Sequence, residues 1–408
     1  MNCRHCGSLL EQNFLDLGFA PPSNAYLTKE CLSSSETYYP LKVMVCQNCW
    51  LVQTEDYADA GALFTDEYAY FSSTSSSFLN HAKDYSDLII DRLNLSSESF
   101  VIEIASNDGY LLKNFLKRGI PCLGIEPTKS TAKAARKLGL EVIEEFFGQE
   151  FAKNLAATHQ KADLIIGNNV FAHVPDINDF TAGIKECLSS NGTITLEFPH
   201  LMSLINYNQF DTVYHEHFSY LSLQAVSSIF AAAGLKIINV DKLQTHGGSL
   251  RVYGCHSEDS RAIDVSVKEF LEEEKHNKLN VLKTYTDFQS KANEIKDSLL
   301  SFLLEQKKQG KTVAAYGAAA KGNTLLNFAG IKTDLIKFVA DAAEAKQNKY
   351  MPGSHIPIVN PAYLINANFD FLLILPWNIS DEIYNQLKQE INPQVKFVTA
   401  IPELKIFS

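Results

Sequence analysis

The chain has 408 residues, of which 46% are hydrophobic and 20% charged, and its formal net charge is −11. This length exceeds one ordinary hydrophobic core, so we expect two or three domains. The acidic balance argues against broad nucleic-acid binding, although a few Lys or Arg residues can still hold an anionic small molecule. No apolar run approaches the roughly 20 residues of a membrane span and no secretory signal is visible, so we expect a soluble cytoplasmic protein.

Two Cys-x-x-Cys hooks stand near the start of the chain, one at Cys3 and Cys6 and the other at Cys46 and Cys49. Two such hooks supply four thiolates in a tetrahedral arrangement, which is typical of a structural zinc site. The segment between the hooks is longer than the loop of an ordinary zinc ribbon, so we expect a small subdomain there. Free thiols or a redox pair are the alternative, but neither hook has the strand-to-helix setting of a redox motif. We otherwise expect the first 70 or so residues to be irregular and rich in turns.

Short apolar runs alternate with amphipathic stretches between residues 99 and 196. The pattern predicts strands over 100–104, 121–125, 163–167 and 193–198, and helices over 110–116, 130–137 and 177–188. Alternation of this kind predicts a parallel sheet with helices on both faces.

The turn after the first of these strands reads EIASNDG and is typical of a cofactor loop. Methyltransferase loops carry glycine at every second position after an acidic residue, and here Ala105 and Asn107 occupy two of those positions. Glu126 ends the next strand, roughly 20 residues on, where dinucleotide folds bind a ribose diol. The polar loop favours the amino-acid end of S-adenosylmethionine over a pyrophosphate, and another nucleotide cofactor is the alternative. The predicted cofactor residues are Glu103, Ala105, Ser106, Asn107, Asp108, Gly109, Glu126, Pro127, Phe147 (or Phe146), Asn168 and Asn169.

Histidine, glutamate and tyrosine gather in the segment YHEHFSY, after the last strand of this sheet. His173 follows strand 163–167, and both segments leave the carboxyl ends of parallel strands, so we expect them to border one crevice. A histidine with a near-neutral pKa removes a proton, and a second histidine or a tyrosine holds the resulting oxyanion. A metal site at His215 and His217 is the alternative, but it lacks an obvious third ligand. We expect His215 itself to be a surface histidine or one whose hydrogen bonds are satisfied.

A charged stretch with helical periodicity, including 269–275 and 284–306, is expected to form a pair of helices that joins two domains. Alternation then resumes, with strands predicted over 312–316, 336–340, 369–375 and 395–400 and a helix over 323–328. The motifs HGGSLR and YGAAAKGN offer cations for an anionic substrate. A solvated lysine is the alternative for Lys321, and a strand-edge ion pair the alternative for Arg251. The predicted substrate-binding residues are His246, Gly247, Ser249, Arg251, Tyr316, Gly317, Lys321 and Asn323.

Taken in order, these motifs resemble the sugar C-methyltransferase family of deoxysugar biosynthesis. The matching segments are the double Cys-x-x-Cys, EIASNDGYLL, GIEP, NNVFAHVPD, EHFSYLS, HGGSLRVY and YGAAAKGNTLL, and they cover nearly the whole chain. The resemblance implies an α/β protein with three domains. A small zinc-binding domain would span 1–70 and a class I methyltransferase Rossmann-like domain 71–258. A C-terminal Rossmann-like domain, 259–408, would help to bind a nucleotide sugar.

The resemblance further implies S-adenosylmethionine-dependent methylation at C-3 of a nucleotide-linked 4-keto-6-deoxysugar. It implies that His217 removes the C-3 proton, with Glu216, Tyr214 and His173 beside it. It also implies an N-terminal tyrosine in the site, and Tyr68 and Tyr70 are both candidates. The competing interpretations are an N- or O-methyltransferase for another small molecule and a non-catalytic zinc-ribbon binding module. The sequence leaves open the nucleotide base, the sugar substituents, the C-3 configuration and the oligomeric state.

Overall fold

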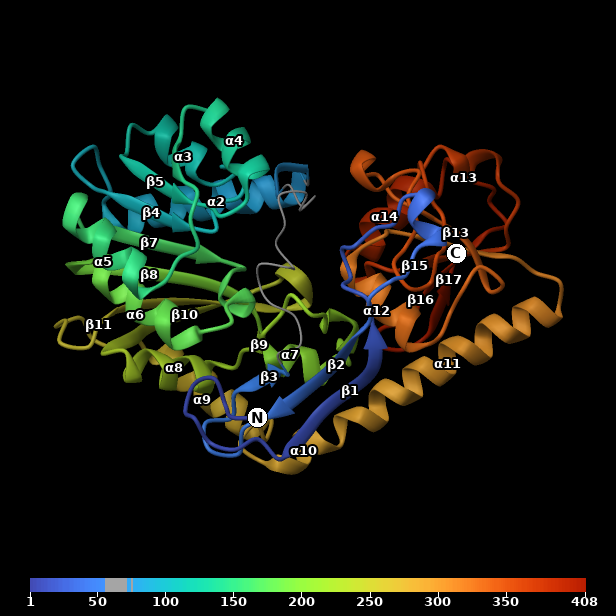
Figure 1. Ribbon diagram of the computed structural model, residues 1–408, viewed down its shortest axis with the longest axis horizontal. Helices are drawn as coiled ribbons and strands as arrows, with labels where there is room; N and C mark the ends of the chain where they lie inside the picture. Colours follow the sequence, from blue (N-terminus) through green and yellow to red (C-terminus); the bar gives the residue numbers. More distant parts are fainter. Residues whose placement is uncertain (56–71, 75) are drawn as a thin grey trace.

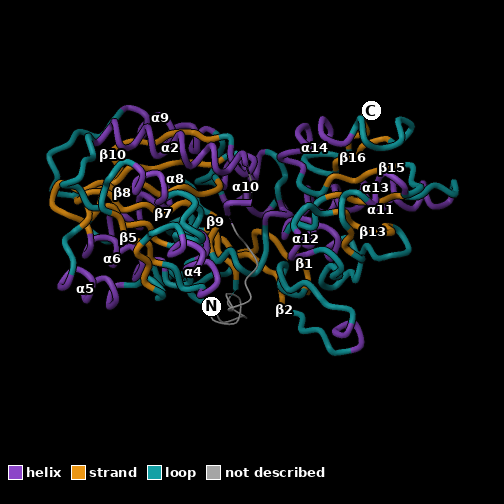
Figure 2. Tube along the Cα trace, turned by 90° about the horizontal axis from the view of Figure 1, so that it is seen from above, coloured by secondary structure: helices purple, strands orange, loops and turns teal. Residues whose placement is uncertain are grey.

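The computed structural model describes residues 1–55, 72–74 and 76–408 of the chain. Figure 1 shows two α/β lobes joined at their base by the N-terminal strands and by one long helix. Figure 2 shows the same two lobes from above, with sheet strands enclosed by helices in each. Among the described residues, none of the helices combines the length and the apolar character that a bilayer crossing requires.

The N-terminal region forms a four-stranded antiparallel sheet in the order β1-β2-β3-β9. Its strands are β1 (Gln12–Ala20), β2 (Tyr39–Val45), β3 (Val52–Thr54) and β9 (Ser219–Tyr220). Our expectation of an irregular region was therefore wrong. The reason lies in β1, where two register shifts break the two-residue alternation by which a strand is recognised. The expected subdomain between the cysteine hooks is present, because β1, η1 (Glu30–Ser33) and β2 lie there.

The first lobe is a seven-stranded sheet in the order β10-β11-β8-β7-β4-β5-β6. Strands β4 to β8 pair in parallel, and β11 and β10 extend the sheet antiparallel at one edge. One buried cluster joins the sheet to α2, α3 and α4, and another joins it to α5, α6, α8 and α9, so helices cover both faces as predicted. The strands are β4 (Val101–Ile104), β5 (Cys122–Ile125), β6 (Glu141–Ile143), β7 (Ala162–Asn168), β8 (Leu188–Pro199), β10 (Leu235–Leu243) and β11 (Ser249–His256). The helices are α2 (Ser76–Leu93), α3 (Leu112–Lys117), α4 (Lys129–Lys137), α5 (Gln149–Thr158), α6 (Ile177–Cys187), α7 (Leu201–Asn206), α8 (Leu223–Ala232) and α9 (Val265–His276).

The second lobe is a six-stranded sheet in the order β14-β13-β12-β15-β16-β17, in which only β17 runs antiparallel among the described strands. Its strands are β12 (Val313–Tyr316), β13 (Ile336–Ala340), β14 (Ile358–Val359), β15 (Phe371–Ile374), β16 (Lys396–Thr399) and β17 (Lys405–Phe407). Its helices are α12 (Ala320–Phe328), α13 (Tyr363–Asn366) and α14 (Ser380–Leu387). The linking stretch contains α9, α10 (Leu282–Thr286) and α11 (Phe288–Lys308), three helices where we expected two.

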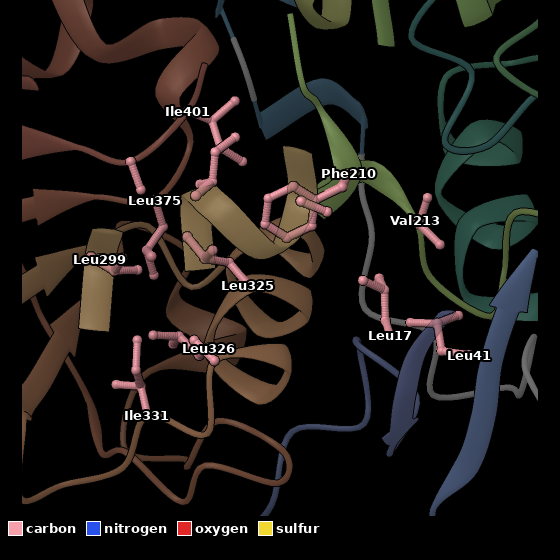
Figure 3. Packing of buried hydrophobic residues seen from close by; sticks show 14 of the residues in the cluster. Leu17, Leu41, Phe210, Val213, Leu299, Leu325, Leu326, Ile331, Leu375 and Ile401 are labelled. Carbon is pink, nitrogen blue, oxygen red and sulfur yellow. The ribbon is translucent and has the colours of Figure 1, made fainter. Parts of the chain in front are cut away.

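A continuous apolar core joins the N-terminal sheet to the second lobe. Figure 3 shows Leu17 and Leu41 of the N-terminal strands, Phe210 and Val213 of the loop before the histidine cluster, and Leu325 of α12. Burial of such side chains contributes about 1.5–3 kcal/mol each. The loop that leads into the histidine cluster is therefore held between two parts of the protein. The short 3-10 helices are η2 (Ser72–Thr74), η3 (Phe171–His173), η4 (Phe210–Thr212), η5 (Thr245–Gly247), η6 (Glu344–Lys346) and η7 (Trp377–Ile379).

Candidate active site

The four cysteines of the two hooks converge, with all their Sγ atoms within 4.8 Å of one another. The Cys3 and Cys49 sulfurs lie 3.5 Å apart, as do the Cys6 and Cys46 sulfurs. A tetrahedral ion with Zn–S bonds near 2.3 Å separates its sulfurs by about 3.8 Å. The donor set and its spacing therefore fit a four-thiolate zinc site.

Both hooks fold into the same turn. The N–H of the first cysteine in each hook donates to the carbonyl five residues later, at 2.8 and 2.9 Å. The residue after the second cysteine is left-handed in both hooks, with φ of 73° at Gly7 and 61° at Trp50. Glycine adopts this conformation without strain. Trp50 is held in it by stacking on Tyr285, with ring centroids 5.6 Å apart.

A cavity of about 520 Å³ opens at the carboxyl ends of β4, β5 and β7. Its walls include seven of the eleven predicted cofactor residues, together with His173 and His246. Phe146 and Phe147 both line it, as do residues that we did not predict, among them Phe78, Tyr110 and Phe180. The seven are Ala105, Asn107, Glu126, Pro127, Phe147, Asn168 and Asn169.

The cofactor loop keeps a glycine-like backbone although two glycines are replaced. Ala105, Asn107 and Gly109 have φ of 57°, 50° and 77°, so every second residue is left-handed. The Asn107 N–H donates to the Glu126 carboxylate at 2.9 Å, which ties the loop to the end of β5. A Cβ on Gly109 would lie 2.3 Å from Leu140, so this glycine is required for space as well.

The other predicted cofactor residues lie behind the cavity wall with Gly109. Ser106 is fully buried, and the Asp108 carboxylate accepts the Ser73 N–H at 3.2 Å. Burial and the neighbouring Glu126 charge raise the pKa of the Glu103 carboxyl well above its usual value. The side chains of Glu103, Ser106 and Asp108 are all buried inside the lobe.

His217 and His173 lie together, with ring centroids 4.6 Å apart, and the Tyr214 ring is 3.8 Å from that of His217. The His217 Nδ1 is 2.9 Å from the Thr212 carbonyl. A carbonyl only accepts, so Nδ1 carries the proton and Nε2 is left as the basic nitrogen. Burial lowers the pKa of His217 well below its usual value, and that of His173 to about 4. Both imidazoles are therefore neutral near pH 7.

Glu216 connects the cluster to the N-terminal region. Its carboxylate accepts from the Asn24 amide at 2.7 Å, and its carbonyl accepts from His173 Nδ1 at 2.8 Å. Burial raises the pKa of Glu216 to about 7. His215 points elsewhere, since its Nε2 donates to the Tyr39 carbonyl at 3.3 Å. Tyr68 and Tyr70 lie outside the described residues.

The HGGSLR segment turns from the cavity into strand β11. His246 lines the cavity, whereas the Gly247 carbonyl accepts from the Gln209 amide at 2.8 Å. The Ser249 hydroxyl donates to the Thr245 carbonyl of the same turn at 2.9 Å. Arg251 is buried and pairs with Glu197 at 2.6 Å. An ion pair is the alternative given above to a substrate-binding role for this residue.

The YGAAAKGN segment lies at the start of α12. The Lys321 ammonium donates to the Asn378 amide oxygen at 2.7 Å and lies 4.7 Å from the centre of the Trp377 ring. The Asn323 amide donates to the Ser23 carbonyl at 2.6 Å, so it links α12 to the N-terminal region. Tyr316 is buried, and Gly317 has φ of 89° with Pro376 where a Cβ would stand.

Sequence reasoning missed Asp211, Trp377 and Asn24. The Trp377 indole donates to the Asp211 carboxylate at 2.8 Å, between the second lobe and η4. Burial raises the pKa of Asp211 to about 7, and the Lys321 charge opposes that rise. None of the three stands in a local motif, because each acquires its partner only when distant segments pack together.

Three family models match the chain: a zinc binding domain at residues 3–64, a methyltransferase domain at 78–240 and a C-methyltransferase C-terminal domain at 244–402. The C-methyltransferase NovU of Streptomyces niveus is 33% identical over 406 residues, which cover 100% of this chain and 96% of NovU. The chain belongs to the C-methyltransferase family. This C-methyltransferase is S-adenosylmethionine-dependent and carries a class I Rossmann-like domain, as the motifs predicted.

Solved structures are similar to about half of the C-methyltransferase chain. The PH0226 protein of Pyrococcus horikoshii OT3 is 14% identical with a TM-score of 0.39, covering 47% of this chain and 99% of that protein. The magnesium protoporphyrin IX methyltransferase of Synechocystis PCC 6803, solved with bound SAH, is 13% identical with a TM-score of 0.36. That match covers 44% of this chain and 83% of the Synechocystis chain.

Proposed function

We propose that this C-methyltransferase methylates C-3 of a nucleotide-linked 4-keto-6-deoxysugar, with His217 as the base that removes the C-3 proton. The observation that carries the proposal is the state of His217, a buried and neutral imidazole whose Nδ1 is fixed by the Thr212 carbonyl. Its ring lies beside His173, which lines the cavity assigned to the cofactor. A methyltransferase acting on nitrogen or oxygen has no comparable need for a carbon-acid base.

The residues beside His217 suit the negative charge that such a reaction develops on O-4. Loss of a proton next to the C-4 ketone gives an enolate, and an oriented donor beside O-4 stabilises it. Tyr214 lies beside His217, and its hydroxyl is proposed for this role. His173 is not suited to it, because its Nδ1–H donates to the Glu216 carbonyl and its Nε2 is left as an acceptor. Bound S-adenosylmethionine supplies the methyl group to the carbanion. Holding the base, the carbon and the sulfonium together gives the rate advantage of proximity.

The proposal also assigns the remaining groups. The cavity residues from Ala105 to Asn169 would hold the cofactor, and Lys321 the diphosphate of the sugar nucleotide. The four cysteines would hold one structural zinc ion, since a closed thiolate shell leaves no position for chemistry. We retain the division into domains 1–70, 71–258 and 259–408 as part of this proposal.

The test is a proton-exchange assay on the His217→Gln variant, with a panel of nucleotide 4-keto-6-deoxysugars in D₂O. Deuterium uptake at C-3 is read by mass spectrometry. Loss of a general base lowers the rate by roughly 10²–10⁴-fold. Binding of S-adenosylhomocysteine, measured by calorimetry, should be retained.

His215→Gln is the matched control, because it is the same substitution two residues away on a ring that contacts the Tyr39 carbonyl. The control should keep most of the exchange rate. Undiminished exchange in His217→Gln would exclude this residue as the base. If no sugar of the panel is methylated while a different acceptor is methylated on nitrogen or oxygen, the substrate assignment fails.

A further inference from the structure

The two zinc hooks have the same internal turn but different outer contacts. The spacer residues of the second hook, Gln47 and Asn48, are exposed. Those of the first hook, Arg4 and His5, are partly buried and bond across to the methyltransferase lobe. A hook that only completed a metal site would not need these contacts, because its turn is closed by its own backbone.

The first hook is hydrogen-bonded to the start of α6. The amide of Asn178 donates to the Arg4 and His5 carbonyls at 3.2 and 2.8 Å. His5 Nδ1 lies 2.8 Å from the Asn178 amide oxygen, and His5 Nε2 lies 3.1 Å from the Ser228 hydroxyl on α8. The Arg4 guanidinium donates to the Pro175 carbonyl at 2.7 Å. Pro175 lines the cofactor cavity, so this bond reaches the cavity wall directly.

The same guanidinium reaches the segment that carries the proposed base. It donates to the Thr54 carbonyl at 3.1 Å and lies 5.5 Å from the centre of the Phe218 ring. The Thr54 N–H donates to the Phe218 carbonyl at 3.1 Å, and the Phe218 N–H donates to the Ala172 carbonyl at 2.8 Å. Phe218 directly follows His217, and Ala172 directly precedes His173. Arg4 therefore contacts the cavity wall and the His217 segment directly, and it is linked to the His173 segment through Phe218.

We infer that the Arg4–His5 spacer of the first hook positions the cofactor cavity and the histidine segments relative to each other, so that a loop of the metal site contributes to cofactor affinity. Arg4 is a positioning residue, since it acts through Pro175 and Phe218. The inference rests on the proposed function only for the role of His217. The effect of Arg4 on cofactor affinity depends only on the cavity, and it is measured without any sugar.

The test compares Arg4→Ala with Gln47→Ala, which changes the equivalent spacer position of the second hook. Both variants should retain one zinc per chain by metal analysis. A hydrogen bond from a charged donor to a carbonyl corresponds to roughly a tenfold change in affinity. We therefore expect Arg4→Ala to bind S-adenosylhomocysteine about tenfold more weakly, with no change in Gln47→Ala. Arg4→Lys should recover part of the affinity because it keeps one donor, whereas a general loss of stability would not be relieved in this way.

Asn178→Ala is the second variant, to be used if Arg4→Ala does not fold, because it removes the same link from the α6 side and leaves the hook intact. Weakened S-adenosylhomocysteine binding with zinc retained supports the inference in either variant. Affinity equal to that of Gln47→Ala, with zinc retained, overturns it. Failure of the sugar proposal would appear separately, as a wild-type enzyme that binds S-adenosylhomocysteine but methylates no sugar nucleotide.

Discussion

Arg251→Met removes one half of a buried ion pair, and the structure allows the cost to be worked out. The guanidinium donates to one Glu197 oxygen through Nε at 2.7 Å and Nη2 at 2.6 Å. It also lies 4.6 Å from the centre of the Tyr85 ring. Burial alone would raise the pKa of Glu197, yet His81 and Arg251 hold it below its usual value. Removing Arg251 leaves a buried carboxylate that keeps its contact with the His81 imidazole.

Breaking a buried pair in this way costs about 3–5 kcal/mol. His81 lies 2.8 Å from the other Glu197 oxygen and offsets part of the loss, so we expect about 3 kcal/mol. The free energy of unfolding is measured by urea titration of the full chain. The double variant Arg251→Met/Glu197→Gln should be more stable than Arg251→Met, because it leaves no unpaired buried charge. A loss below about 1 kcal/mol, the level of an exposed pair, would refute this reasoning. A substrate-binding role for Arg251 would then be open again.

Three further predictions concern metal, substrate and pH. Cys46→Ser should lose the zinc found in the wild type and lower the unfolding midpoint. Cys31→Ser, on an exposed cysteine, should change neither. Equal metal content in the two variants would contradict the zinc site. Lys321→Ala should weaken nucleotide-sugar binding about tenfold or more with unchanged S-adenosylhomocysteine affinity, since one charged contact to the diphosphate is lost; calorimetry with both ligands checks this. Because burial lowers the pKa of His173 to about 4, the unfolded chain takes up a proton from pH 6.5 downward that the native protein does not, so stability should fall as the pH drops through that window. His173→Gln should lose less stability over this range. The free energy of unfolding is measured by urea titration at pH 7 and pH 5, and an equal difference between the two values in the variant and the wild type would exclude His173 as a cause.

The strands that could be predicted are those made by a short, continuous apolar run. The run at 336–340 matches β13 (Ile336–Ala340) at both ends, and 163–167 falls within β7. Strands β10 and β11 were not predicted, and β10 carries a register shift that interrupts its alternation. Strand β6 has only three residues, too few for any period to appear. Bulges and short pairings depend on the neighbouring strand, so a pattern within one segment does not reveal them.

The cofactor loop could be predicted because its chemistry is local. Ala105 and Asn107 stand at alternate positions of one turn, and the structure gives both the left-handed backbone that the glycine pattern requires. The Trp377 bond to Asp211 spans 166 residues, and the Asn24 bond to Glu216 spans 192. Such pairs form only through the packing of three sheets, and no spacing rule in the sequence brings them together.

Cofactor binding and proton abstraction, the two halves of the proposed reaction, depend on residues in different parts of the protein. Among the described residues, those that line the cofactor cavity lie between Ser72 and His246, within the first lobe. The histidine segment is instead held from three sides: Asn24 of the N-terminal region bonds Glu216, His173 bonds its carbonyl, and the Thr324 hydroxyl of α12 donates to the Val213 carbonyl at 2.8 Å. The Thr212 carbonyl that fixes the His217 tautomer is next to that last contact. Disturbing the second lobe should therefore slow proton abstraction before it weakens cofactor binding, because the α12 contact is next to the carbonyl that orients His217.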